Sequence, residues 1–162
     1  IEHELSKLHW PRETNVSLEV TDSVTAFLDV DLPEIEDFPK RIAIVSANGK
    51  RIHFKDKSET ALREEYERHT HGVAFRLAGG VFSILPAIKT VVVSGYSERV
   101  QGQTGDVEDE YLYSVRIPRD GFSKINFSRL EHVDPVEALA AFEMRRSMTK
   151  TAIFKAIEPM TP

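Results

Sequence analysis

The sequence contains no cysteine, a single tryptophan and no long apolar run. The missing cysteine excludes disulfides, thiolate metal ligands and a cysteine nucleophile, and it agrees with a cytosolic setting. No apolar stretch approaches the roughly 20 residues that span a bilayer, and no segment resembles a signal peptide. Glycine patterns typical of a nucleophile elbow, a phosphate loop or a dinucleotide fold are also absent. We therefore expect a cytoplasmic protein with no membrane partner.

The 162 residues suit one domain with one hydrophobic core, and 41% are apolar and 29% charged. The chain begins with Ile1 rather than methionine, so we expect a domain of a larger, bacterial protein. Charge is uneven, with 3 basic and 10 acidic residues over 1–40 but 8 basic and 6 acidic over 111–162. This asymmetry indicates either a basic binding face at one end or two ends that pack together.

Hydrophobic spacing predicts an α+β fold in three parts. An apolar stripe that ends at Pro11 predicts the end of a short N-terminal helix over residues 1–11. Residues 12–148 form a single domain, a mostly antiparallel mixed sheet of six to seven strands with two main helices packed on it. Residues 149–162 are expected to be an extended C-terminal tail.

Two hairpins are expected in the first third of the chain. Residues 15–32 alternate between apolar and polar, which places Val20 opposite Val24 and turns Asp29 and Asp31 away from the apolar face.

In the second hairpin, residues 41–54, Asn48-Gly49 is typical of a type I′ turn that pairs Val45 with Ile52. The first strand of this hairpin is apolar on both faces, so we expect an interior position in the sheet.

A long helix is predicted to begin with a capping box at Asp56 and to break near Gly79-Gly80. Its inward stripe is expected to be Leu62, Tyr66, Val73, Leu77, Val81 and Ile84 or Leu85. A buried strand over residues 88–100 follows, in which Gly95 indicates a bulge or a close backbone approach, and residues 110–117 are expected to pair with it. Residues 122–127 are expected to be a short strand. The last helix has Asp134 at its N-cap and is expected to extend to about Ser147.

The acidic segment 29–37 is the first candidate for chemistry. Carboxylates on one strand face are suitable ligands for Mg²⁺ or Mn²⁺, and such a site activates water for phosphodiester hydrolysis. His53 and Lys55 are two apart on the next hairpin and would position water or phosphate, although no second carboxylate accompanies them. The alternative is a solvated strand end whose charges prevent edge pairing. The candidate metal ligands are Asp29, Asp31, Glu34 and Asp37, and the catalytic candidates are Asp29, Asp31, His53 and Lys55.

A second candidate surface combines tyrosines with cations, which is what single-stranded nucleic acid binding requires. The cations are Arg116, Lys124, Arg145 and Arg146. An acidic protein partner would suit them equally well. Strand parity favours the tyrosines as core residues, because Tyr111, Tyr113, Val115 and Ile117 share one face in a regular strand.

No complete catalytic constellation is present in the sequence. The leading hypothesis is therefore a regulatory or protein-interaction module that binds a protein partner or self-associates. The alternatives are a metal-dependent nuclease or phosphodiesterase and a nucleic-acid-binding domain.

Overall fold

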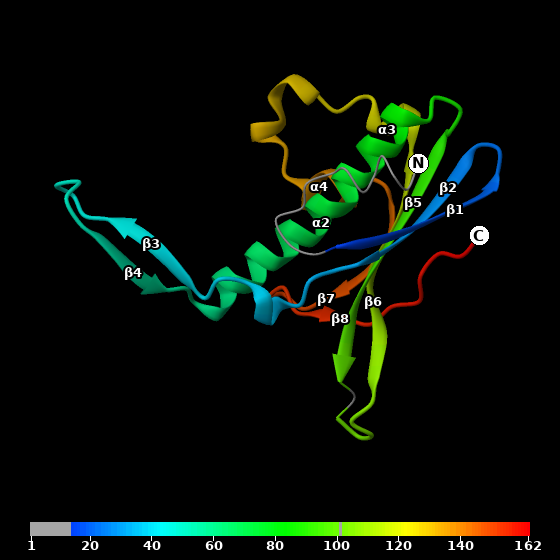
Figure 1. Ribbon diagram of the computed structural model, residues 1–162. Coiled ribbons are helices and arrows are strands. Elements are labelled where there is room, and N and C mark those ends of the chain that lie inside the picture. Colours follow the sequence, from blue (N-terminus) through cyan, green and yellow to red (C-terminus); the bar gives the residue numbers. More distant parts are fainter. Residues whose placement is uncertain (1–13, 101) are drawn as a thin grey trace.

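The computed structural model describes residues 14–100 and 102–162, so the helix predicted over 1–11 lies outside the described residues. Figure 1 shows one long helix lying across a twisted sheet, with a separate ribbon projecting from the body. The elements in chain order are β1 (Asn15–Asp22), β2 (Thr25–Asp31), η1 (Ile35–Asp37), β3 (Arg41–Val45), β4 (Ile52–Asp56), α2 (Glu59–Ile84), β5 (Thr90–Val100), β6 (Val107–Pro118), α3 (Arg119–Phe122), η2 (Phe127–His132), α4 (Pro135–Ala140), β7 (Glu143–Met148) and β8 (Phe154–Lys155).

The main sheet has six strands in the order β1-β2-β5-β6-β7-β8. Only β2 and β5 are parallel, and the other neighbours are antiparallel. This mixed sheet with helices confirms the α+β class. The strands β3 and β4 form a second, two-stranded sheet of their own.

The core lies between α2 and one face of the main sheet. The buried stripe of α2 includes the predicted Tyr66, Val73, Leu77 and Val81. It meets fully buried side chains of β2, β5 and β6, among them Leu28, Val93, Tyr113 and Ile117. Burying a side chain of this size contributes about 1.5–3 kcal/mol, so this layer dominates stability. Within the described residues, no helix is both long and apolar enough to cross a membrane.

Two details of α2 differ from prediction. Its N-cap is Ser58, whose hydroxyl accepts the Ala61 N–H at 3.1 Å, rather than Asp56, which ends β4. The helix also continues unbroken through Gly79-Gly80, and a Cβ at Gly79 would make only an ordinary contact, 3.7 Å from Phe122. The predicted break is therefore wrong, because burial of Leu77 and Val81 beside the glycines outweighs their cost of about 1 kcal/mol each.

The C-terminal part contains the largest error of the sequence prediction. Asp134 caps α4 as expected, with its carboxylate accepting the Val136 N–H at 2.8 Å. The helix nevertheless ends at Ala140, and Glu143–Met148 forms β7 because it adds an antiparallel strand to β6. The predicted strand over 122–127 is also wrong, since α3 and a turn occupy that stretch.

The β1–β2 register is displaced by two residues from the predicted one. Val20 pairs with Ala26 rather than with Val24. The reason is the Asp22 carboxylate, which accepts the N–H groups of Val24 and Thr25 and tightens the turn. Because the displacement is an even number, the apolar residues stay on the predicted face.

Gly95 marks both a bulge and a close approach. The β5–β6 register shifts between Gly95 and Tyr96, and Tyr113 packs directly over the glycine. This shift reverses the expected side of Tyr111, which pairs with Tyr96 on the face remote from α2 while Tyr113 stays in the core. The bulge therefore separates two tyrosines that strand parity placed together.

Replacing Gly95 by alanine should lower the free energy of unfolding by about 1–3 kcal/mol. A Cβ at this position would lie 2.6 Å from Tyr113 Cζ and 2.7 Å from Leu32 Cδ1, so the core must shift. Urea unfolding measures the loss. Gly72→Ala is the matched control, because nothing lies within 4 Å there, and it should instead stabilise α2 by about 0.5–1 kcal/mol. Equal stability of Gly95→Ala and the parent chain would contradict the prediction.

Candidate functional site

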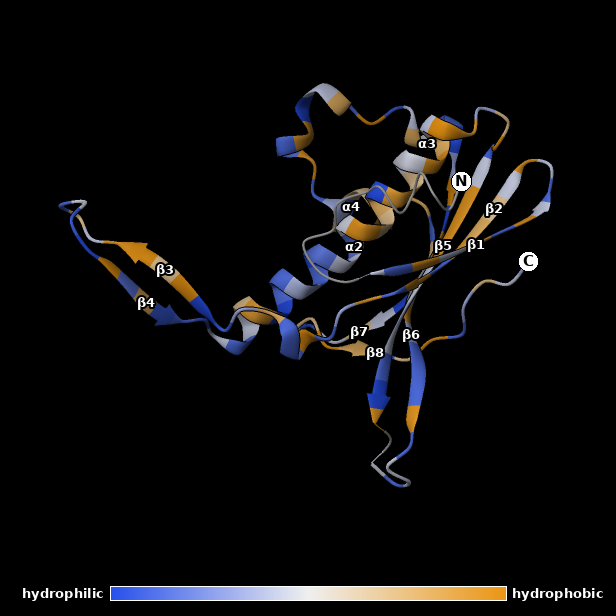
Figure 2. Cartoon of the chain, viewed as in Figure 1, coloured by the Kyte–Doolittle hydropathy of each residue, from blue (hydrophilic) through white to orange (hydrophobic). Residues whose placement is uncertain are grey.

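The clearest feature outside the core is the projecting hairpin formed by residues 40–57, here called the arm. Its strands β3 and β4 are exposed along their whole length. Figures 1 and 2 show the arm directed away from the body, with hydrophobic residues along β3. The prediction of an interior strand is therefore wrong, and apolar residues that resemble core residues face solvent. The exposed fractions are Ile42 50%, Ile44 41%, Val45 61%, Ile52 65% and Phe54 63%.

Local hydrogen bonds shape the tip of the arm. Ser46 N–H donates to Arg51 O at 2.8 Å, and Gly49 N–H donates to Ser46 O at 2.8 Å. Only Gly49 has a positive φ, +70°, so the turn is not the predicted type I′ turn, which requires a positive φ at Asn48 as well. The predicted pairing of Val45 with Ile52 is nevertheless confirmed.

The two faces of the arm differ in chemistry. One face carries the apolar pairs Ala43–Phe54 and Val45–Ile52, with the Arg41–Asp56 ion pair at its base. The other face alternates isoleucines with His53 and Lys55. Over residues 40–57 there are six basic residues and one acidic residue, Asp56, a net charge of +5. Since the whole chain carries −5, the rest of the chain carries −10.

The base of the arm is held to the body. Lys57 N–H donates to Lys40 O at 2.8 Å, which closes the two strands where they join η1 and α2. The Lys57 ammonium forms an ion pair with Glu65 on α2. An exposed ion pair, Arg41 Nε to Asp56 Oδ1 at 3.1 Å, lies beside it. The arm therefore has a defined root where it joins the body.

Beside this root is an open pocket of about 630 Å³, here called the groove. It lies between η1, the first turns of α2, the end of β5 and the β7–β8 turn. Its apolar lining includes Ile35, Tyr66, Val100, Ile153 and Phe154. Four carboxylates also line it, Glu34, Glu36, Asp37 and Glu98, against two arginines, Arg63 and Arg99.

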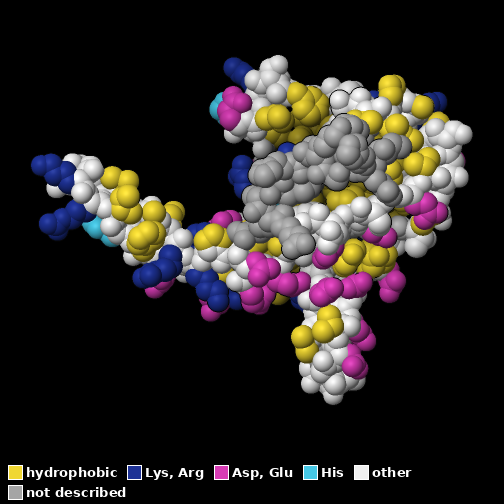
Figure 3. Space-filling model, viewed as in Figure 1, with side chains coloured by type: hydrophobic (Ala, Val, Ile, Leu, Met, Phe, Trp, Pro, Cys, Tyr) yellow, Lys and Arg dark blue, Asp and Glu magenta, His cyan; other side chains and the backbone are white. Residues whose placement is uncertain are grey.

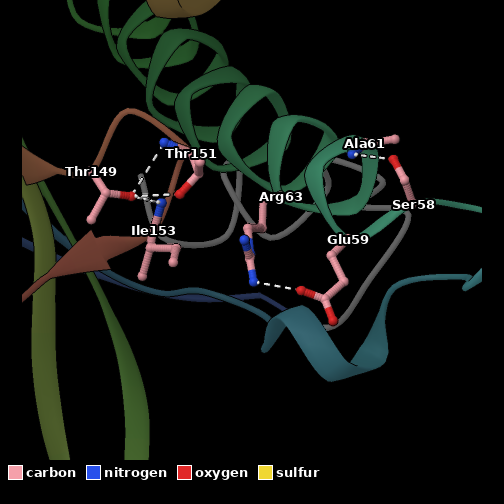
Figure 4. A network of polar contacts seen from close by, with 7 residues as sticks. All are labelled: Ser58, Glu59, Ala61, Arg63, Thr149, Thr151 and Ile153. Carbon is pink, nitrogen blue, oxygen red and sulfur yellow. Dashed lines mark hydrogen bonds and ion pairs between the residues drawn. The ribbon is translucent and has the colours of Figure 1, made fainter.

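Figure 4 shows two edges of the groove. On α2, Arg63 Nη2 lies 2.9 Å from Glu59 Oε2. On the β7–β8 turn, the Thr149 hydroxyl accepts the Ile153 N–H at 3.1 Å, and Ala152 adopts a left-handed φ of 56°. Left-handed backbone costs a residue with a Cβ roughly 1–2 kcal/mol, which these hydrogen bonds offset.

Partial burial governs the electrostatics of the groove. Glu34 accepts a hydrogen bond from the Ser97 hydroxyl at 3.2 Å, and burial raises the pKa of Glu34 above its usual value. Burial likewise raises the pKa of Tyr66. Arg99 forms an ion pair with Glu110, in which Arg99 Nε lies 3.5 Å from Glu110 Oε2. A cation placed beside Glu34 would favour its charged form and so oppose the effect of burial on its pKa.

The acidic segment does not form one cluster. Asp29 lies on the sheet face remote from α2, and burial raises its pKa, which the nearby Tyr111 hydroxyl partly opposes. Asp31 lies on that same face, opposite Tyr96 of β5. Glu34 and Asp37 instead line the groove. Within the described residues, no group of three or more His, Asp or Glu side chains is positioned to hold a metal ion.

The catalytic candidates are separated as well. The neighbours of β2 are β1 and β5, whereas His53 and Lys55 lie on the arm in the other sheet. The hairpin that follows β2 in sequence is thus not the hairpin beside it in space. A second, smaller pocket of about 340 Å³ does lie next to Asp29, between the sheet and residues 159–162 of the tail. Tail residue Met160 is fixed there by its N–H, which donates to Ser114 Oγ at 3.0 Å.

The four cations proposed for nucleic acid do not form one surface. Arg146 points toward α2, where it contacts Glu67 at 3.5 Å and His71 Nε2 at 2.8 Å. Arg145, one residue earlier on β7, binds Pro159 O of the tail at 2.9 Å, on the opposite face. Arg116 forms an ion pair with Glu143 at 3.2 Å. Lys124 is exposed after α3.

Comparison of the chain with protein-family models, with curated proteins and with solved structures gives no match.

Sequence reasoning located the arm as a hairpin but missed its exposure. The one available signal was charge, since residues 40–57 contain six cations together with large apolar residues in a chain that is otherwise acidic. No local signal marks the groove, because its walls come from residues 34–37, 63–66, 98–100 and 152–154.

Proposed function

We propose that this chain is a protein-interaction module that binds its partner through the arm. The observation that carries the proposal is the arm itself, where large apolar side chains project into solvent between cations. A contiguous exposed apolar patch rimmed by polar residues is typical of a protein-binding surface. In Figure 3 the dark-blue cations lie around the yellow apolar side chains of the arm.

The positive charge of the arm indicates which class of partner it binds. A surface with net charge +5 attracts an acidic surface and repels a basic one. Nucleic acid is also acidic, but its backbone offers no apolar surface to cover Val45, Ile52 and Phe54. A protein surface that combines carboxylates with apolar side chains matches both properties of the arm.

We expect the variant Val45→Ser/Ile52→Ser to lose partner binding while keeping its fold. These side chains are more than half exposed, so their replacement should change the free energy of unfolding by less than about 1.5 kcal/mol. Partner binding is measured with a photo-crosslinking amino acid at position 54, in cells that naturally produce the protein. Discrete adducts should form, and Lys50→Glu/Arg51→Glu should suppress them.

The matched control places the same crosslinker at Val20, an exposed valine of β1 outside the arm. Identical adducts from positions 20 and 54 would contradict an interaction specific to the arm. A duplex DNA of about 20 base pairs tests the other class of macromolecule. Binding that falls steeply with salt and depends on Lys50 and Arg51 would make the arm a nucleic-acid-binding element and overturn the proposal.

A further inference from the structure

We propose that the partner bound by the arm is a second copy of this chain, and that the arm of each copy lies in the groove of the other. This inference rests on the proposed function, because it assigns a partner to the same arm. Three properties of the described residues support it: charge, apolar matching and the position of the arm's root.

The groove has the charge that the arm requires. Four carboxylates and two arginines line it, and each arginine already contacts a carboxylate, Arg63 with Glu59 and Arg99 with Glu110. The acidic end of the β5–β6 hairpin continues this wall, since residues 106–110 include four carboxylates. A surface of net charge +5 therefore meets an acidic one when two copies approach.

The groove also has an apolar lining for the apolar face of the arm. Val100 is 70% exposed and Ile153 42% exposed at its mouth, above the buried rings of Tyr66 and Phe154. A pocket of about 630 Å³ lies within the range of roughly 300–1,000 Å³ typical of binding clefts, which leaves room for several side chains. The apolar face of the arm, with Phe54, therefore matches the apolar lining of the groove in chemistry.

The segments that line the groove also join the arm to the body, so arm and groove lie next to each other in each copy. This arrangement favours a dimer in which each copy places its arm in the groove of the other. Residues of η1 line the groove, and only three residues separate η1 from β3. The chain leaves β4 and, within a few residues, enters the turns of α2 that form another wall. A two-fold axis beside the root therefore brings each arm to the partner's groove. The arm does not reach its own groove, because its closed root directs it away from the body (Figure 1).

The chain allows a clean test because it contains no cysteine. Single variants Phe54→Cys, in the arm, and Ile153→Cys, in the groove, are purified, mixed and oxidised. We expect a disulfide-linked species of twice 18.4 kDa containing one copy of each variant. Val20→Cys mixed with either variant is the matched control and should react at least about tenfold more slowly, because proximity raises the effective concentration of the thiols.

Charge reversal supplies an independent measurement by sedimentation equilibrium. The arm variant Lys50→Glu/Arg51→Glu/Lys55→Glu and the groove variant Glu36→Lys/Glu98→Lys should each weaken self-association at least about tenfold. The two sets combined in one chain should restore it, as expected for a direct pairing of surfaces. Raising the salt from about 50 to about 500 mM should weaken the parent dimer, because exposed charges are screened.

Several results would overturn the inference. A parent chain that stays monomeric at every concentration excludes the dimer. Disulfides that join position 54 to position 54 would indicate arm–arm pairing in place of groove binding. If the crosslinker at position 54 links only other proteins, the arm remains an interaction element but its partner is not a second copy. If it links nothing and the chain is monomeric, both proposals fail.

Discussion

Replacing Arg119 by methionine should lower the free energy of unfolding by about 3–5 kcal/mol, because one guanidinium satisfies three main-chain carbonyls where α2 ends. Its Nε donates to Ile88 O at 2.6 Å, Nη1 to Phe82 O at 2.9 Å and Nη2 to Leu85 O at 2.6 Å. The cation also lies 4.6 Å from the centroid of the Phe82 ring. Arg119 follows directly after β6, so its loss separates the end of the helix from the sheet.

Several contributions combine at Arg119. A hydrogen bond to a charged group contributes about 1.5–3 kcal/mol, and a cation at the C-terminal end of a helix adds about 0.3–1 kcal/mol through the helix dipole. These contributions share one side chain and do not add fully. Methionine keeps an apolar stem of similar length, so the loss reports mainly on the guanidinium.

Arg116→Met is the matched control for Arg119→Met. Arg116 lies three residues earlier, and its recorded ion pair is with the exposed carboxylate of Glu143. A pair of this kind contributes about 0–1 kcal/mol, so the control should remain nearly as stable as the parent. Equal losses for the two variants, measured by urea unfolding, would show that the three carbonyl contacts contribute no special stability.

The second large effect is expected from acidification through His71. This side chain is completely buried, donates from Nδ1 to Glu67 O at 2.7 Å and accepts at Nε2 from Arg146 Nη1 at 2.8 Å. The Nε2 contact requires a neutral ring, because the arginine can only donate. Burial is the main cause that lowers the pKa of His71 to about 4, and the positive charge of Arg146 lowers it further.

The sign follows from proton binding. Between pH 6.5 and about 4 the unfolded chain holds a proton on His71 and the folded chain does not, so stability falls as the pH falls. The loss is about 1.4 kcal/mol per pH unit and about 3 kcal/mol in total. Above pH 6.5 the His71 ring is neutral in the folded and the unfolded chain alike, so it does not reduce the free energy of unfolding.

Urea unfolding at several pH values measures the effect, with His71→Gln as the non-titrating variant. The parent chain should show the steeper loss below pH 6, whereas exposed His53→Gln should follow the parent. Burial raises the pKa values of Asp29, Glu34 and Glu67, and these groups act in the opposite direction, since each binds its proton more tightly in the folded state. Glu67 also contacts Arg146, so we compare the slopes of the free energy of unfolding against pH rather than its absolute values. Parallel slopes for the parent and His71→Gln would contradict the assignment.

The two stability predictions and the arm involve different parts of the molecule. Arg119 and His71 connect α2 to β6 and β7 through half-buried and buried contacts, whereas the apolar face of the arm is exposed. Variants of the arm are therefore expected to affect association without affecting folding. This separation makes the proposed function testable with a folded protein.

Periodicity alone determined the elements whose contacts are local or adjacent. The spacing of Tyr66, Val73, Leu77 and Val81 predicted the inward face of α2, and the apolar run within residues 88–100 predicted β5, with residues 110–117 as its partner. Such patterns are reliable because one face of each element must be buried. The glycine at position 95 was also correctly interpreted as a bulge, since it has no Cβ to obstruct Tyr113.

Tertiary structure decided the features that depend on distant partners. Residues 143–148 have a helical context in sequence, but β6 offers an unpaired edge and they become β7. The same bulge at Gly95 moves Tyr111 to the face of Asp29, which no local pattern foretells. The acidic segment is divided between two faces because the chain leaves the sheet after Asp31 to form η1.

The sequence by itself determined the α+β class, the hydrophobic face of α2, the hairpin at 41–56 and the positive charge of that hairpin. Only the tertiary structure decided that the hairpin is the arm and that its root adjoins the groove. Apolar residues on both faces of a strand favour burial in general, yet burial needs a neighbouring surface, and the main sheet pairs β2 with β5 instead. The apolar face of the arm therefore remains available for a partner.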